Sequence, residues 1–104
     1  MSPEEHSRVC LALSTLYRKV VKDTSKAKRW LELAKDKITD QKVLLQFYVE
    51  STEILEHESK FYSALDSAKK AVELAKRFYR DDDYTVFELQ MTLADLHEKC
   101  EDRP

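Results

Sequence analysis

The sequence predicts an all-helical domain of about five antiparallel helices, and two observations support this prediction. The chain contains no glycine, and its two prolines stand at positions 3 and 104, so the residues that tight β-hairpin turns require are missing. Apolar residues recur at the three-and-four spacing of an amphipathic helix, most regularly in the alanine-rich stretch 61–79.

The first two helices are bounded by residues that favour helix starts. Ser2 and Pro3 are typical of a capping residue followed by a proline in the first turn, and the apolar pattern then continues to Val21. The segment 23–25 offers the next cap, and a second apolar stripe reaches Ile38.

Three further helices are predicted in the same way. Asp40 caps a third helix with an apolar face between residues 43 and 55, and the alanine-rich fourth helix begins near Ser59. The three aspartates at 81–83 suit the positive amino-terminal end of a fifth helix. Because the linkers hold only a few residues, successive helices must run antiparallel.

Small residues recur once in each predicted pair of helices. Ala27 and Ala34 in the second helix are matched by Ala64 and Ala71 in the fourth, 37 residues later. A second set of small residues stands at positions 14, 52 and 94, separated by 38 and 42 residues. A period of roughly 34–45 residues with two helices in each unit indicates an α-solenoid.

At these positions the chain resembles the tetratricopeptide repeat family, particularly its longer-period members of the kinesin light chain type. Phe61 matches the aromatic residue that stands three residues before the first alanine of the second helix. The other matching positions are Ser14, Thr52 and Ala94 in the first helices, and Ala27, Ala34, Ala64 and Ala71 in the second helices.

The resemblance implies a single domain over residues 1–104 that folds as an α-solenoid of antiparallel helix-turn-helix repeats. The first repeat is expected at about 3–38, the second at about 40–80 and an extra helix at about 83–101. The family's first-helix tryptophan and glycine, and the proline after its second helix, are missing. A three-helix microtubule-interacting-and-trafficking module and a closed five-helix bundle therefore stay as alternative folds.

In this family the first helix of each repeat lines a concave groove, so the resemblance implies a scaffold that binds a peptide or helix of another protein, without catalysis. The groove is expected to be basic near its amino-terminal end and acidic elsewhere, which favours a partner segment with basic residues toward the acidic end. The implied partner-binding residues are Arg8, Leu11, Thr15, Arg18, Gln46, Val49, Glu53, Glu56, Glu88, Met91, Asp95 and Glu98.

A structural role is the alternative hypothesis, and it starts from the fifth helix. No sixth helix follows in the sequence to cover its apolar residues, and an uncovered apolar strip favours association. The chain would then form a homodimer or be a fragment of a longer solenoid. The residues predicted for self-association are Val86, Leu89, Leu93 and Leu96.

Potential zinc ligands stand at both ends of the chain. His6 with Cys10, and His97 with Cys100, each place two ligands on one helical face. Four ligands would require the two ends to meet, and only a head-to-tail dimer would allow this in a solenoid. We therefore expect no metal and no cofactor.

The acidic residues of the third helix superficially suggest a catalytic site. Glu50, Glu53, Glu56 and His57 follow a helical spacing, but the Glu-x-x-His pattern of di-metal bundles is absent. We also find no phosphate-binding glycine loop and no nucleophile motif. The sequence therefore predicts a protein that is not an enzyme.

The charge of the chain is banded, from +5 over residues 18–37 to -5 over residues 80–104. A basic patch with Trp30 among it favours nucleic acid. Because the chain is net acidic, at -2, and Trp30 is on an apolar stripe, we do not expect this partner. No apolar run approaches the roughly 18 residues of a membrane span, and the amino terminus is acidic where a signal peptide is basic. We expect a cytoplasmic protein, with the nucleus as an alternative, and reduced cysteines.

Overall fold

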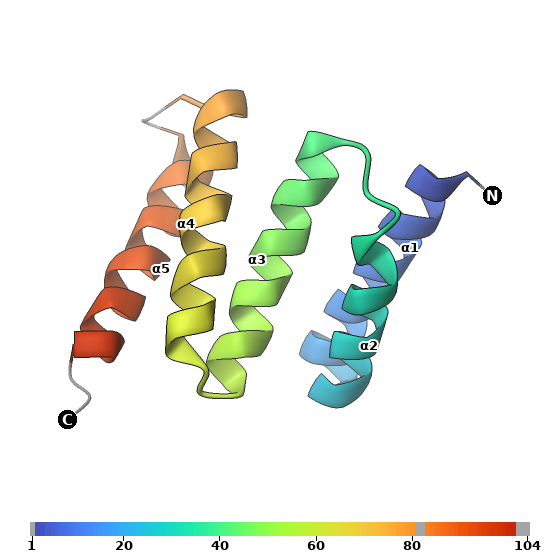
Figure 1. Cartoon of the computed structure of the whole chain (residues 1–104), viewed down its shortest axis with the longest axis horizontal. Coiled ribbons are helices and arrows are strands. Elements are labelled where there is room, and N and C mark those ends of the chain that lie inside the picture. The colour runs from blue at the N-terminus through green and yellow to red at the C-terminus, as the bar shows by residue number, and fades with distance from the viewer. Residues whose placement is uncertain (1, 81–82, 102–104) are drawn as a thin grey trace.

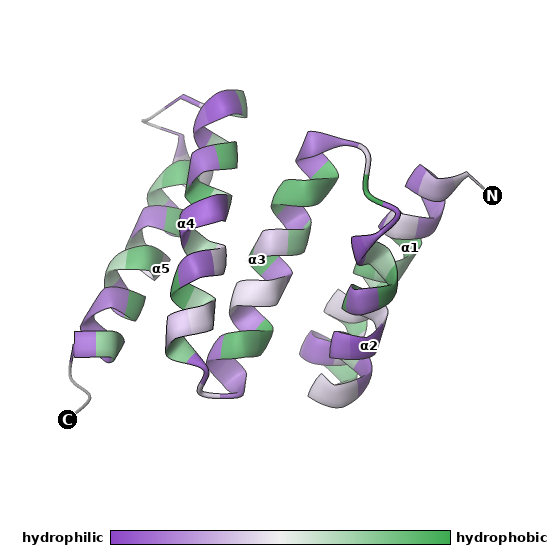
Figure 2. Cartoon of the chain, viewed as in Figure 1, coloured by the Kyte–Doolittle hydropathy of each residue, from purple (hydrophilic) through white to green (hydrophobic). Residues whose placement is uncertain are grey.

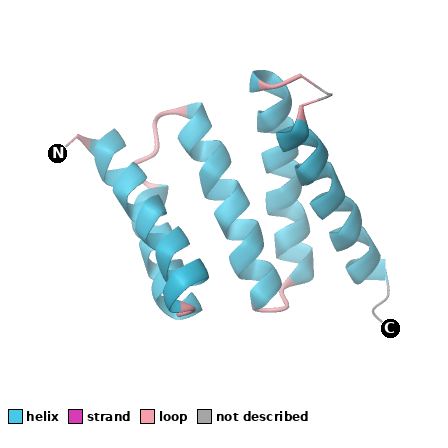
Figure 3. Ribbon diagram, turned by 180° about the vertical axis from the view of Figure 1, so that it is seen from behind, coloured by secondary structure: helices cyan, strands magenta, loops and turns pink. Residues whose placement is uncertain are grey.

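The computed structural model describes residues 2–80 and 83–101, and over these ranges the chain is helical apart from short connections (Figures 1 and 3). The helices are α1 (Pro3–Leu16), the π-helical segment η1 (Tyr17–Val21) that continues it, α2 (Thr24–Lys35), α3 (Gln41–His57), α4 (Phe61–Phe78) and α5 (Tyr84–Glu101). The predicted all-helical class with five helices is therefore confirmed.

Side-chain caps start four of the helices, because the first N–H groups of a helix have no partner within it. Ser2, Asp23, Asp40 and Asp83 each accept a hydrogen bond from a backbone N–H two or three residues later. The donors are, in the same order, the N–H groups of Glu5, Lys26, Lys42 and Thr85, at 3.1, 3.1, 2.8 and 2.9 Å. Of the three aspartates predicted to precede the fifth helix, those at 81 and 82 lie outside the described residues.

Two helix boundaries differ from the predicted ones. α2 ends at Lys35, so Ile38 lies in the connection to α3, from which it still packs against buried apolar residues. α4 begins at Phe61 instead of near Ser59, because Ser59 takes a positive φ of 62° and closes the end of α3.

The helices pack mainly against their neighbours in the chain. α1 packs against α2, α3 against α4, and α4 against α5, while α2 and α1 both contact α3. Figure 1 shows the helices side by side, with α1 and α2 at one end of the longest axis and α5 at the other. The array measures 45 × 32 × 22 Å. This order leaves α1 and α5 separated by the helices between them.

Alanines are buried where the helices pack against one another. Ala27, Ala34, Ala64 and Ala71 have no exposed surface. A small side chain allows helix axes to approach closely, and the hydroxyl of Ser14 uses this closeness to donate a 2.8 Å hydrogen bond to the carbonyl oxygen of Ala27. The small residues that recur in the sequence are thus packing residues in α1, α2 and α4.

The third position in the series of small residues behaves differently. Ser14 and Thr52 are buried, whereas Ala94 on α5 is exposed. Ser14 lies against the helix that follows its own, and no described helix follows α5. The face of α5 that carries Ala94 is therefore open.

The apolar strip predicted for self-association does not coincide with this open face. Val86 and Leu96 have no exposed surface and pack in the interior with residues of α4. Leu89 and Leu93 are half-buried beside them. The large apolar residues that α5 does expose are Tyr84 (73% exposed), Phe87 (55%) and Met91 (57%).

Hydrophobic and hydrophilic residues alternate along every helix, as Figure 2 shows. Among the residues that the structure describes, no helix combines the length and the apolar character that crossing a bilayer requires. Cys10 and Cys100 are both buried and unbridged.

Candidate functional site

A cleft of about 580 Å³ opens between α1, α3 and α5. α1 contributes Arg8, Leu11, Ala12 and Thr15. α3 contributes Leu45, Gln46, Val49, Glu50 and Glu53. The third wall comes from Tyr79, which directly follows α4, and from Thr85, Glu88, Leu89 and Thr92 on α5. Side chains of the first, third and fifth helices therefore line one cleft together.

Apolar residues provide much of the lining, and charged residues stand at the edges. Leu11 and Leu45 are buried, at 4% and 6% exposed, and Leu89 is half-buried. Glu53 and Glu88 are exposed on the same cleft. An apolar surface with a few charged groups around it suits a ligand that buries apolar side chains and carries a few fixed polar groups.

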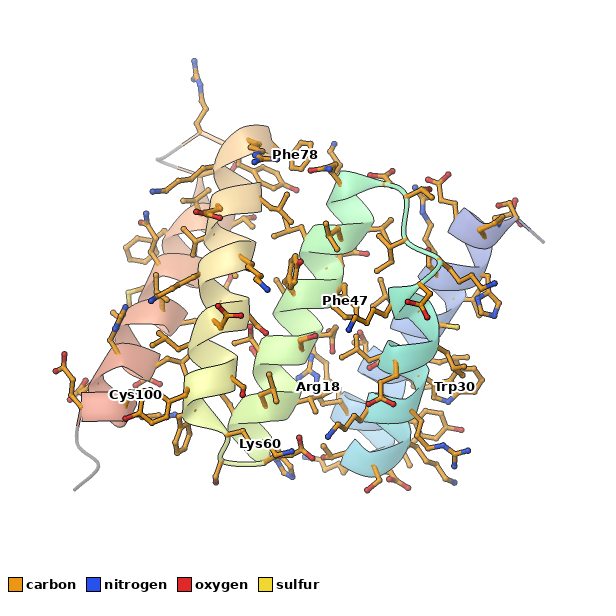
Figure 4. All side chains as sticks on the ribbon, viewed as in Figure 1. Arg18, Trp30, Phe47, Lys60, Phe78 and Cys100 are labelled. Carbon is orange, nitrogen blue, oxygen red and sulfur yellow. The ribbon has the colours of Figure 1, made fainter. Side chains whose placement is uncertain are left out.

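Glu50 is the buried carboxylate of the cleft, and it is held by Thr15 of α1 and Arg18 of η1. Arg18 Nε lies 2.8 Å from Glu50 Oε2, and Arg18 Nη2 donates to Glu50 Oε1 at 3.0 Å. The Thr15 hydroxyl lies 2.9 Å from the same Oε1. Figure 4 shows Arg18 in the space between the first helix pair and α3. This two-bond ion pair joins η1 to α3, and the planar guanidinium and carboxylate groups match in geometry.

The electrostatics of this wall are visible in two pKa shifts. The hydrogen bond to Glu50 raises the pKa of Arg18 above its ordinary value. Partial removal from water raises the pKa of Glu53, and the nearby guanidinium of Arg18 opposes that rise. Glu53 keeps an exposed side chain, so its carboxylate stands where a ligand can reach it.

The cleft brings together seven of the residues predicted for partner binding, from three different helices. They are Arg8, Leu11, Thr15, Gln46, Val49, Glu53 and Glu88. The other five do not line it: Arg18, Glu56, Met91, Asp95 and Glu98.

Ion pairs within the chain explain part of this difference. Lys99 lies 3.3 Å from Glu56 and 3.1 Å from Asp95, so one cation of the same chain offsets part of the negative charge at the acidic end of the predicted groove. Arg8, at the basic end, lies 3.0 Å from Glu4 and 3.4 Å from Asp40. The difference in charge between the basic and the acidic end of the predicted groove is therefore smaller than the sequence alone indicates.

Met91 and Glu98 face away from the cleft. They stand seven residues apart on α5, on the open face that also carries Phe87 and Ala94. α5 turns Val86 and Leu96 toward α4, and this orientation places Met91 and Glu98 on the other side of the helix.

Sequence reasoning missed seven lining residues: Ala12, Leu45, Glu50, Tyr79, Thr85, Leu89 and Thr92. Glu50 stands four residues after Gln46 and three before Glu53, so helical spacing could have found it. Tyr79 lies beyond the last turn of α4, where no periodicity points to it.

The two pairs of potential zinc ligands lie on different helices, His6 with Cys10 on α1 and His97 with Cys100 on α5. Cys10 Sγ lies 3.8 Å from His6 Nδ1, and burial raises the pKa of the Cys10 thiol. Cys100 is near the far end of α5 (Figure 4). Among the described residues, no group of three or more histidine, cysteine or acidic side chains is placed to hold a metal ion.

Comparison with family models, with curated proteins and with solved structures finds no match to this chain.

Proposed function

We propose that this protein is an interaction module that binds a segment of another protein in the cleft between α1, α3 and α5, without catalysis of its own. The observation that carries the proposal is the cleft itself, which three helices line with apolar residues, with Glu53 and Glu88 exposed beside them and Arg8 on α1. A short amphipathic helix or peptide places apolar anchors in such a groove and basic residues at its edge.

The pairing of the helices supports a repeat arrangement of the tetratricopeptide type. Each helix packs against the next in the chain, and α1 also reaches α3 across the first pair. In that arrangement the first helix of every repeat lines the binding surface, and α1, α3 and α5 are the corresponding helices here. The unbridged cysteines are consistent with the cytoplasm, which we propose as the compartment, with the nucleus as a second candidate.

A binding role also fits the state of the cleft carboxylates better than a catalytic one. Both Glu50 oxygens are engaged by Arg18. A carboxylate held in this way is a poor general base, because proton transfer requires a free lone pair near the substrate. Glu53 and Glu88 are the acidic groups that a basic partner would meet.

A selection experiment followed by charge reversal tests the proposal. Peptides are selected from a random phage-displayed library on the wild-type protein, and their affinity is measured for Glu53→Lys/Glu88→Lys. The matched control is Glu32→Lys/Glu73→Lys, which changes the net charge equally on exposed positions of α2 and α4.

We expect the cleft variant to lose about tenfold or more in affinity and the control to keep it. Equal affinity of the selected peptides for all three proteins, or failure to select any peptide, would reject the cleft as the binding site.

Association through α5 is a second candidate function, and the exposure of Phe87 and Met91 favours it. The chain would then act as a self-associating structural domain or as one piece of a longer solenoid. The cleft and this face are different surfaces, so both functions are compatible.

A further inference from the structure

The outer face of α1 and η1 carries apolar residues that nothing in the described chain covers. Val9, Leu16 and Val20 are 44%, 44% and 71% exposed, and their spacing of seven and four residues places them on one stripe. The stripe lies opposite Ser7 and Leu11, which are 0% and 4% exposed. This helix is thus apolar on two sides, one in the core and one in solvent.

α2 extends the same end of the array. Leu33 is 54% exposed and, with Trp30 and Tyr17, lines a shallow hollow of about 310 Å³ on this side. Figure 4 shows Trp30 on the side of α2 that faces away from α3. We name this surface the α1–α2 end face, consisting of Val9, Leu16, Tyr17, Val20, Trp30 and Leu33.

The opposite end of the longest axis is also apolar. On α5, Tyr84, Phe87 and Met91 share one side, and the buried Val86 and Leu96 are on the other. We name Tyr84, Phe87, Met91 and Ala94 the α5 end face. Single exposed apolar side chains are normal on a protein surface, whereas grouped ones mark interaction sites. The grouping of such residues at both ends of the array therefore indicates two interaction surfaces.

The charges around the two end faces are opposite in sign. Lys26 and Arg29 line the hollow of the α1–α2 end face, and residues 18–37 carry +5 in total. Glu98 follows Met91 by two turns on the α5 end face. Helix α5 as a whole carries four acidic residues and one lysine. Among the described residues, neither Arg29 nor Glu98 has a salt-bridge partner, so both charges are available to another molecule.

The size of the faces matches a specific interface. A cross-section of 32 by 22 Å, perpendicular to the longest axis, covers about 700 Å². Stable interfaces bury about 800 Å² on each partner. Because the extents enclose the whole array, about 700 Å² is the largest flat contact that either end offers, close to that value.

We propose that the protein associates head to tail, with the α5 end face of one copy against the α1–α2 end face of a second copy. This contact covers both apolar stripes at once and brings the basic rim against acidic α5. A heterologous contact of this kind does not pair a surface with itself, so it continues into longer assemblies unless a rotation closes it. The proposal does not depend on peptide binding, because the cleft lies on a different side of α1 and α5.

Complementation between two variants tests the arrangement. Leu16→Glu places a carboxylate on the α1–α2 end face, and Met91→Arg places a cation on the α5 end face. Each variant keeps one intact face. Sedimentation is measured for the wild type and for each variant alone over a range of concentrations, and for their equimolar mixture. Val20→Glu with Phe87→Arg is a second pair, and Lys69→Glu on the exposed side of α4 is the control. Circular dichroism confirms that each variant is folded.

We expect the wild type and Lys69→Glu to form concentration-dependent oligomers. Each end-face variant alone should be monomeric, and the mixture should form a one-to-one complex. A wild type that stays monomeric at every concentration would overturn the proposal. Dimers of Leu16→Glu alone, with a monomeric Met91→Arg, would overturn it in favour of a symmetric α5 dimer.

Discussion

The contact between Arg18 and Glu50 joins η1 to α3 beside the cleft. Their side chains are only 18% and 10% exposed, and three hydrogen bonds reach the carboxylate. Such a pair stabilises little relative to apolar residues of the same shape. Losing one partner is different, since it leaves the other charge buried and unpaired.

Arg18→Met is therefore expected to lower the free energy of unfolding by about 3 kcal/mol, because it strands the Glu50 carboxylate. Adding Glu50→Leu to the same protein should recover most of this loss. Urea denaturation of the two single variants, the double variant and the wild type measures the coupling. Additive effects of the two substitutions would mean that the pair contributes no buried interaction.

The raised pKa of Glu53 predicts the direction in which the stability of the protein changes with pH. Its pKa is raised in the folded protein by partial removal from water, so the folded state holds this proton more tightly than the unfolded state. The stability of the wild type relative to Glu53→Gln should fall as the pH rises from below the ordinary glutamate pKa, about 4.3, to above the raised value. Denaturation of both proteins across this range tests the sign; a constant or rising difference would contradict it.

At the scale of the helices, the turn between α3 and α4 shows how a chain without glycine ends a helix. Ser59 takes the left-handed conformation, its N–H donates to the Glu56 carbonyl oxygen at 3.0 Å, and the Lys60 N–H donates to that of Leu55 at 2.9 Å. This is the Schellman motif, in which glycine is the usual residue because it has no Cβ. Lys22 takes a similar conformation after η1.

Ser59→Gly is expected to raise the free energy of unfolding by about 0.5–1 kcal/mol, since it relieves the left-handed strain and loses only part of that gain to the freer unfolded chain. Thermal or urea denaturation measures it. Ser63→Gly, on an exposed position in the first turn of α4, is the matched control and should destabilise by about 0.5 kcal/mol, because serine lies between alanine and glycine in helix propensity. A Ser59→Gly protein that is as destabilised as the control would show that the turn does not hold the conformation described.

The sequence was sufficient to predict the helices themselves. Their starts follow from local side chains such as Asp23 and Asp40, whose caps depend on residues two or three positions away. The buried face of α4 follows from Ala64 and Ala71 at helical spacing. The left-handed Ser59 was not predictable, because no glycine or asparagine marks the position.

The site was predictable only in part, for a physical reason. Residues such as Gln46 and Val49 reach the cleft because their helix has neighbours on both sides that fix its orientation. On α5, the packing of Val86 and Leu96 against α4 decides which side faces the cleft, and the predicted groove residues Met91 and Glu98 lie on the other side. Long-range ion pairs, such as that of Lys99 with Glu56 43 residues away, leave no trace in local spacing.

At the scale of the whole molecule, three kinds of surface are distinct. The cleft between α1, α3 and α5 is apolar with acidic edges, and the two end faces are apolar with opposite charge. The outward sides of α2 and α4, meaning their exposed positions outside the α1–α2 end face, carry mainly charged residues such as Lys35 and Lys69. A molecule built in this way can hold a partner segment in its cleft while its ends contact other copies.

The most direct test of the binding role is to map where a selected peptide contacts the isotope-labelled protein, from changes in its amide NMR signals on titration. The largest changes should fall on residues of the cleft, including Leu11, Val49 and Thr92, with small changes on the outward sides of α2 and α4. Changes concentrated on those outward sides, with unchanged signals from the cleft, would contradict the account.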